Sequence, residues 1–202
     1  MSNELTINQK VNGSENIRWD LTDLFNGVDD PKINESLAIA AIKILAYFKI
    51  KHDAIALGLS NVYWPGRMQL IKSMPSIFFD VAHNVSSFLA MTKFVDKLNI
   101  EGDKILILAL QKHKDINLAI EAICSTFDKI VFTQTNIRNF IPAEHLCSKF
   151  PIPMDNKQII INPSKAINVH KNHYANDCIV MCGTHYLGGY ICEEFKISFD
   201  NI

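Results

Sequence analysis

The chain has no long hydrophobic run and no excess of charge of either sign. Its most apolar windows, such as residues 105–110, are far shorter than the ~20 residues that a membrane-spanning helix needs, and the opening "MSNELTINQK" lacks the apolar core of a signal peptide. Twenty basic and 21 acidic residues leave a net charge of -1, so no overall field would gather nucleic acid or an anionic membrane. We therefore expect a cytoplasmic protein without a nucleic-acid or membrane partner.

Cysteine occurs in an odd number and without regular spacing. The five residues are Cys124, Cys147, Cys178, Cys182 and Cys192, and most of them sit inside apolar segments. This distribution is typical of buried thiols in a reducing compartment rather than of a disulfide framework.

The chain changes character twice along its length. Residues 1–30 are polar, rich in Asn and Asp and weakly periodic, which predicts an irregular lead-in. Residues 31–63 follow as a helical segment: "NESLAIAAIKILAYF" has apolar side chains at helical spacing after the potential N-cap Asn34, and "HDAIALGLS" predicts a shorter helix that ends near Gly58. Residues 64–202 then form the third part.

This third part alternates apolar runs of strand length with amphipathic stretches. The runs are "SIFFDV", "DKILILAL", "DKIVFTQT", "QIIIN" and "DCIVMC", and between them lie "SSFLAMTKFVDKL", "INLAIEAICSTF", "PAEHLCSKF" and "SKAINVHKNHYA". Continuous apolar strands are typical of a sheet that is covered on both faces. The pattern predicts an α/β, Rossmann-like, mostly parallel sheet with helices on both faces, and "RMQLI" as one antiparallel edge strand.

One segment, "WPGRMQLIKSMPSIFFDVAHN" at residues 64–84, concentrates polar side chains at a strand end. Ligands of open parallel sheets bind beyond the carboxyl ends of the strands, which is where Asp80, His83 and Asn84 fall. Pro65 and Gly66 make a rigid corner that could aim Arg67 at a phosphate or a carboxylate. The alternative is that Arg67 pairs with Asp80 and serves the structure alone.

These residues resemble the C-terminal domain of folylpolyglutamate synthase and dihydrofolate synthase, a branch of the Mur ligase superfamily. In that family a Pro-Gly-Arg and an Asp-x-Ala-His-Asn-Pro element flank a short hairpin. Further similar stretches are "INESLAIAAIKIL", "QKHKDI" and "CIVMCGTHYLGG", so the resemblance covers about residues 33–194. It implies a Mur ligase C-terminal-like domain at 64–202, with 31–63 as the end of the ligase's central domain.

The resemblance also implies an activity, ATP-dependent amide ligation. In the family, ATP phosphorylates a folate carboxylate and the amino group of glutamate attacks the acyl phosphate. Carried over by position, Asn34, Arg67 and Asp80 would contact ATP, with Arg67 near its phosphates and Asp80 near its ribose. His83 would line the place where the acyl phosphate meets glutamate. Lys114 and Asp115 would belong to a supporting loop.

Several features depart from the family's pattern. Val85 replaces the usual Pro, His113 stands where Asp is usual and Thr184 where Ser is usual. The family's phosphate-binding loop and its magnesium ligands lie in an N-terminal ATPase domain, and no G-x-x-x-x-G-K-[ST] occurs in this sequence. We therefore expect ATP and Mg²⁺ to be used only together with that domain, supplied in cis or in trans, and the chain to be inactive alone.

Three other features received a structural or neutral interpretation. Cys182 and His185 could form a thiol nucleophile, but the family's strand ending accounts for them. "HKNH", with His170 and His173, lacks zinc spacing and is interpreted as a solvated helix face. Residues 17–33, "IRWDLTDLFNGVDDPKI", resemble the opening of oligoendopeptidase F-type metallopeptidases; because H-E-x-x-H is absent, we assign no peptidase activity.

Two functional hypotheses follow from the sequence. In the first, the chain is the C-terminal part of a folate-glutamate ligase. In the second, it is a truncated or degenerate nucleotide-binding module without a catalytic role. An exposed apolar patch on the helix at residues 34–48 would favour the first hypothesis, and loss of ordered geometry around Arg67 and Asp80 would favour the second.

Overall fold

A computed structural model of the chain describes residues 39–41, 51–61, 64–137 and 139–199. The chain divides into two units, Met1–Val62 and Tyr63–Ile202. In the first unit, residues 39–41 are helical and α2 (His52–Ser60) continues through Gly58, where we expected it to end. Asn34 and most of the helix predicted after it lie outside the described residues. Within the described ranges, no helix is long and apolar enough to cross a membrane.

The second unit contains one six-stranded sheet of order β1-β2-β6-β3-β4-β5. Its strands are β1 (Gln69–Ser73), β2 (Ser76–Phe79), β3 (Lys104–Leu108), β4 (Lys129–Phe132), β5 (Lys157–Ile159) and β6 (Cys178–Cys182). All neighbours pair in parallel except β1, which runs antiparallel to β2. The predicted mostly parallel sheet with one antiparallel edge strand is therefore confirmed.

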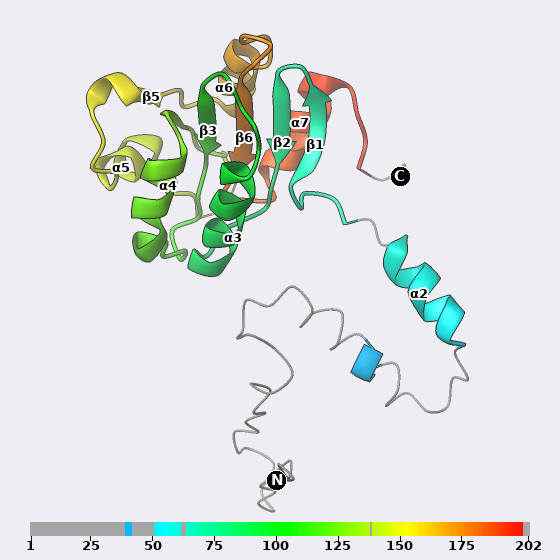
Figure 1. Cartoon of the computed structure of the whole chain (residues 1–202). Coiled ribbons are helices and arrows are strands. Elements are labelled where there is room, and N and C mark those ends of the chain that lie inside the picture. The colour runs from blue at the N-terminus through cyan, green and yellow to red at the C-terminus, as the bar shows by residue number, and fades with distance from the viewer. Residues whose placement is uncertain (1–38, 42–50, 62–63, 138, 200–202) are drawn as a thin grey trace, which may run out of the picture. The chain divides into compact units, whose positions relative to one another are not determined.

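Helices cover both faces of this sheet (Figure 1). One face carries α3 (Val85–Asp96), the short 3-10 helix η1 (Asn117–Ala119) that leads into α4 (Ile120–Thr126), and α5 (Ala143–Ser148). The other face carries α6 (Pro163–His170) and α7 (Leu187–Phe195). A further 3-10 turn, η2 (Met154–Asn156), precedes β5.

Successive side chains of each central strand pack into two separate hydrophobic cores, one on each face of the sheet. Phe78, Leu106 and Val180 pack with the side of α3 and α4, whereas their neighbours Ile105 and Ile179 pack with α6 and α7. Because strand side chains alternate between the two faces, a strand buried on both faces needs an apolar residue at every position. This arrangement explains the continuous apolar runs in the sequence.

Two helices differ from the sequence prediction. α6 begins as expected, with the side chain of Asn162 accepting a hydrogen bond from the amide of Lys165 at 2.9 Å, but it ends at His170 although the amphipathic pattern extends to residue 175. α7 was not predicted. Gly188 and Gly189 stand in its first turn and suppress its helix propensity, while burial of Leu187 and Ile191 in the second core stabilises it.

The direction of the chain reverses at β6. β2 leads into α3 on one face of the sheet, and β6, its neighbour, leads into α7 on the other face. In doubly wound folds, ligands bind at the carboxyl edge where loops leave adjacent strands toward opposite faces. In this chain those two loops begin at Asp80 and at Gly183.

Candidate functional site

Asp80 is the first residue after β2 and is almost fully buried, with 7% of its surface exposed. One carboxylate oxygen accepts the amide of Met68 at 2.8 Å, and the other accepts the amide of Ala82 at 2.7 Å. Burial raises the pKa of Asp80 above its ordinary value of 3.8, against the lowering effect of these two amides and of the charges of Arg67 and His83. The carboxylate thus ties the Pro-Gly-Arg corner to the strand end.

The corner itself is held by main-chain hydrogen bonds. The amide of Val81 donates to the carbonyl of Gly66 at 2.8 Å, and the amide of Gly66 donates to Oε1 of Gln69 at 2.9 Å. Gly66 has φ +71°, and a Cβ at this position would come within 2.7 Å of the Val81 side chain. Glycine is therefore required here by both the backbone conformation and the close approach.

Arg67 lies at the tip of this corner, with its side chain exposed. In the described part of the chain, no hydrogen bond or ion pair joins Arg67 to Asp80. The two side chains therefore do not pair directly, although the charge of Arg67 lowers the pKa of Asp80. Asp80 binds the backbone beside Arg67, and the guanidinium is presented to solvent at the carboxyl edge of the sheet.

His83 and Asn84 connect this corner to α3. Nδ1 of His83 lies 2.8 Å from the carbonyl oxygen of Val81; because a carbonyl only accepts, Nδ1 carries the proton and Nε2 is the acceptor of the neutral ring. Asn84 caps α3 by accepting the amide of Ser87 at 2.9 Å, and the Ser87 hydroxyl accepts the amide of Asn84 at 3.1 Å. This reciprocal cap starts the helix although Val85 stands where the family has Pro.

Lys114 and Asp115 lie in the loop after β3, which is separated from β2 by β6 in the sheet. The amide of Lys114 donates to the carbonyl of Gln111 at 3.0 Å, and Oδ1 of Asp115 accepts the amide of Asn117 at 2.9 Å, which opens η1. His113, which precedes them, is exposed. This loop leaves the same carboxyl edge as Asp80, two strands away in the sheet.

Between the two loops, β6 is followed by a glycine that has no room for a side chain. Gly183 has φ +106°, and a Cβ there would collide with the carbonyl oxygen of Ala109. Thr184 follows, 2% exposed, and its hydroxyl accepts the amide of Tyr186 at 3.3 Å. Here the main chain just after β6 packs directly on the main chain just after β3.

Cys182, the last residue of β6, is fully buried. Burial, and to a lesser degree the charge of Asp80, raises the pKa of its thiol well above the ordinary value. A thiol of this kind does not ionise near neutral pH, so it is not a nucleophile. The interpretation of Cys182 as a structural residue agrees with this environment.

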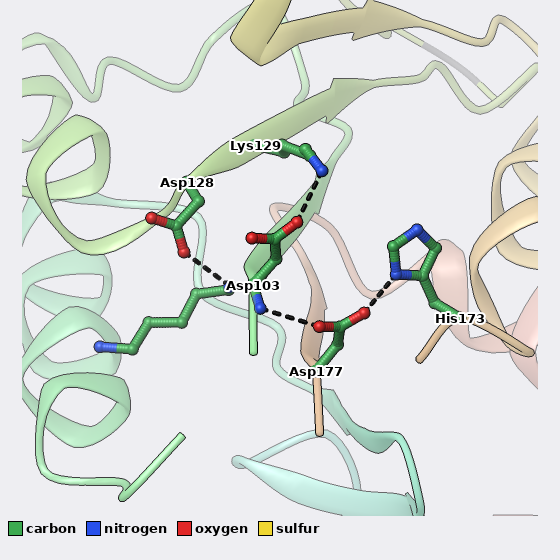
Figure 2. Close-up of polar contacts among 6 residues, drawn as sticks. Asp103, Asp128, Lys129, His173 and Asp177 are labelled. Atoms are coloured by element: carbon green, nitrogen blue, oxygen red, sulfur yellow. Dashed lines mark hydrogen bonds and ion pairs between the residues drawn. The ribbon is translucent and has the colours of Figure 1, made fainter. Parts of the chain in front are cut away.

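A second polar cluster lies at the opposite, amino edge of the strands (Figure 2). The amide of Asp103 donates to Asp177 at 2.8 Å, Lys129 pairs with Asp103 at 2.6 Å, and Nδ1 of His173 contacts the other oxygen of Asp177. The described residues contain no group of three or more His, Cys, Asp or Glu side chains suited to a metal ion. The acids of this cluster bind partners within the protein.

This environment corrects the interpretation of "HKNH" as a solvated helix face. His170 is only 5% exposed, and its Nδ1 lies 2.8 Å from the carbonyl oxygen of Ala166. His173 is half-buried beside Asp177. The physical reason is that α6 ends at His170, so that His173 lies beyond the helix, in the segment that leads to β6.

Of the residues assigned a role from sequence, three gather at the end of β2: Arg67, Asp80 and His83. Lys114 and Asp115 lie two strands away, and Asn34 is outside the described residues, so their assignments stay predictions. Gln69 and Val81 hold the corner but were not singled out. The Val81 amide and the Gln69 side chain both bond to main-chain atoms of Gly66, and such contacts leave no signature in a single sequence.

The chain was compared with known proteins. It is 37% identical to the dihydrofolate synthase/folylpolyglutamate synthase of Buchnera aphidicola subsp. Acyrthosiphon pisum over 95 residues, which are 46% of this chain and 23% of that relative. The solved folylpolyglutamate synthase of Mycobacterium tuberculosis, complexed with ADP and AMPPCP, matches with a TM-score of 0.71 at 22% identity over 82% of this chain and 40% of that one.

A bifunctional folylpolyglutamate synthase/dihydrofolate synthase solved with Mn, AMPPNP and L-glutamate matches with a TM-score of 0.73 at 18% identity, over 83% of this chain and 40% of that structure. At these identities the two solved structures show a shared fold and no more. The chain spans well under half the length of each of the three proteins. The family model described as "Mur ligase, glutamate ligase domain" matches residues 66–185, more than half of the 202 residues, and this range includes Arg67, Asp80 and His83. The chain therefore belongs to the Mur ligase family, as a glutamate ligase domain.

Proposed function

We propose that this chain forms one wall of the ATP and glutamate site of a folate-glutamate ligase. The observation that carries the proposal is the braced corner at the end of β2, where Gly66, Asp80 and Val81 hold Arg67 exposed beside His83. Because the same contacts also stabilise the fold, ligation rather than geometry separates this proposal from a truncated or degenerate nucleotide-binding module. The ligase's remaining wall belongs to a P-loop domain, in the same chain or in a partner, and 31–63 is assigned to the end of its central domain.

Arg67 is assigned to the phosphates of ATP. A guanidinium on a rigid corner can form two parallel hydrogen bonds to phosphate oxygens, and its charge offsets the negative charge of the triphosphate. Asp80 is assigned to the ribose, because a carboxylate has about four acceptor sites and the amides of Met68 and Ala82 use two of them. Asn34, Lys114 and Asp115 are assigned supporting contacts with the nucleotide.

The reaction consists of two balanced steps. A carboxylate oxygen of the folate-type substrate takes the terminal phosphoryl group of ATP and ADP departs. The amino nitrogen of glutamate then attacks the acyl carbon, an amide bond forms, and phosphate leaves with the loss of one proton from nitrogen. His83 is assigned to this second step, since the Nδ1 contact with Val81 leaves Nε2 as an acceptor for that amine proton.

Metal ions are assigned to the P-loop domain. Mg²⁺ takes oxygen ligands, mainly carboxylates and phosphates, and would supply charge neutralisation on the phosphates when bound there. The described residues of this chain offer no three-ligand set, so Arg67 is the cation that this wall contributes. We propose the cytoplasm as the compartment, in keeping with the absence of disulfides among the five described cysteines.

Titration of the ¹⁵N-labelled chain with ADP tests the assignment. We expect weak, saturable shifts of the amides of residues 66–67 and 80–84, because the phosphate-binding loop that supplies most charge-assisted hydrogen bonds is in another domain. Arg67→Met should lower the affinity about tenfold or more, the value of a hydrogen bond to a charged group. Lys149→Met, which removes one charge from an exposed residue after α5, is the matched control.

Three results would contradict the proposal: no shifts at millimolar ADP, submicromolar affinity, or ATP turnover by the pure chain. To separate a ligase part from a non-catalytic module, a P-loop domain from a relative is added with ATP, glutamate and dihydropteroate. Ligation that is lost in His83→Ala supports the ligase. ADP binding without ligation in every mixture would favour the non-catalytic module.

A further inference from the structure

We infer that Gln69 is a positioning residue that orients Arg67, an inference that rests on the proposed function and extends it. Gln69 is the first residue of β1 and stands opposite Phe79 in the antiparallel pair with β2. Its Oε1 accepts the amide of Gly66 at 2.9 Å. The side chain therefore bridges from the strand back across Arg67 to the far side of the corner.

The two peptide units that flank Arg67 are held by the loop after β2: the carbonyl of Gly66 accepts the amide of Val81, and the amide of Met68 donates to Asp80. The amide of Gly66 belongs to the preceding Pro65–Gly66 peptide unit and is held from β1 by Gln69. The flanking peptides set the direction of the Arg67 Cα–Cβ bond, and the Gln69 contact fixes the peptide unit through which the chain enters Gly66.

The corner needs this third contact because its backbone is intrinsically free. Gly66 has φ +71° and Met68 has φ 39°, conformations that the chain does not maintain without tertiary contacts. Pro65 restricts only its own φ. Without Gln69, the amide of Gly66 would turn toward water, and the glycine would sample conformations that swing Arg67 away from the strand end.

The floor beneath the corner shows that its position is specified by packing as well. A Cβ on Gly66 would lie 3.1 Å from the ring of Phe79, and this ring stacks on Phe199 with centroids 5.6 Å apart and planes 15° apart. The floor blocks collapse of the corner into the sheet, and the hydrogen bond to the Gln69 side chain holds the Gly66 amide.

The test compares three variants with the unmodified chain. Gln69→Leu removes the acceptor at similar size, and Gln69→Glu keeps an oxygen acceptor. Lys72→Met is the matched control: Lys72 is also a β1 residue whose side chain makes a tertiary hydrogen bond, from Nζ to the carbonyl of Lys171 at 2.8 Å, but away from the corner. Thermal unfolding of all variants shows that each is folded before it is compared.

The first readout is made without nucleotide. The ¹⁵N order parameters of the Gly66 and Arg67 amides should fall from about 0.85 to below about 0.6 in Gln69→Leu, and should stay at the unmodified value in Gln69→Glu and in Lys72→Met. Unchanged order in Gln69→Leu, or equal loss in the Lys72→Met control, overturns the inference. So does failure of Gln69→Glu to restore the order.

The second readout is ADP affinity. If Arg67 binds the phosphates, Gln69→Leu should weaken ADP about threefold to tenfold, whereas Lys72→Met should leave it unchanged. A mobile corner with unaltered ADP affinity overturns the positioning role. If the unmodified chain does not respond to ADP at all, the proposed function fails, while the order parameters still decide whether Gln69 orients Arg67.

Discussion

The main-chain amide of Met68 donates to Oδ2 of Asp80 at 2.8 Å, although 12 residues separate the two in sequence. This hydrogen bond crosses the β1–β2 hairpin at its open end. It holds the Pro-Gly-Arg corner against the end of β2. The second oxygen of the carboxylate meanwhile accepts the amide of Ala82. A single buried side chain thus sets the geometry of both segments that would face a ligand.

We expect Asp80→Asn to destabilise the domain by about 1–3 kcal/mol. An amide group can offer only one oxygen, so one of the Met68 and Ala82 amides would meet an NH₂ group and remain unsatisfied in a buried site. Denaturant unfolding measures the change, and Asp155→Asn on exposed η2 serves as the control. Equal stability of Asp80→Asn and the unmodified chain would contradict the bracing role.

The pKa of the Asp80 carboxyl should lie above its ordinary value of 3.8, because burial disfavours the charge. The folded state then holds the proton more tightly than the unfolded state, so this residue favours folding at low pH and loses that contribution as pH rises through the interval between the two pKa values. A ¹³C titration of the carboxyl carbon measures the folded pKa. A value below 3.8 would show that the amide and Arg67 contacts dominate over burial.

Two glycines should respond in opposite directions to the same substitution. Gly183→Ala places a Cβ against the carbonyl of Ala109 at φ +106°, and should cost about 2–3 kcal/mol or prevent folding. Gly189→Ala in α7 meets nothing within 4 Å, and should stabilise by about 0.5–1 kcal/mol through helix propensity. Thermal unfolding of both variants measures this difference, and a tolerated Gly183→Ala would contradict the close approach of β6 and β3.

His170 should make the domain less stable in mild acid. Burial lowers the pKa of His170 below its ordinary value of 6.5, against the raising effect of its Ala166 hydrogen bond. As pH falls below the pKa of His170 in the unfolded chain, about 6.5, the unfolded chain binds a proton at His170, whereas the folded chain binds it only at lower pH. The stability present above this pH is therefore progressively lost.

The variant His170→Asn tests this pH dependence, because Asn keeps a donor for the Ala166 carbonyl but does not titrate. Unfolding free energies at pH 7 and pH 5 should differ less in His170→Asn than in the unmodified chain. His145→Asn, on the exposed side of α5, is the matched control and should keep the full difference. An unchanged difference in His170→Asn would place the acid sensitivity elsewhere.

The cysteines should separate by reactivity in the native state. Burial raises the pKa of Cys178 to about 11 and that of Cys182 well above the ordinary value, whereas Cys192 is only half-buried. Brief iodoacetamide treatment at pH 8 followed by mass spectrometry should modify Cys192 before Cys178 or Cys182, with all three modified after unfolding. Early modification of Cys182 would contradict its interpretation as a buried structural residue and would support a role as a nucleophile.

Local sequence patterns predicted most of the fold. The runs at β2, β3, β4 and β6 are apolar at nearly every position because both faces of those strands are buried, and the turn residues around β1 indicated an edge strand. α7 was not predicted because the two glycines in its first turn lower its helix propensity. The end of α6 was not predicted because the amphipathic pattern continues beyond His170. Helix ends are set by tertiary contacts, here the return of the chain toward Asp177, rather than by periodicity.

The sequence by itself determined which side chains stand at the strand end, since Arg67, Asp80 and His83 follow from the order of residues around one hairpin and one buried run. Only the tertiary structure decided how they are used: Asp80 bonds to backbone amides instead of to Arg67, and Gln69 bonds across the corner. Apolar burial follows a repeating pattern that one sequence displays, whereas hydrogen bonds to the backbone depend on distances between segments, which become defined only when the sheet has formed.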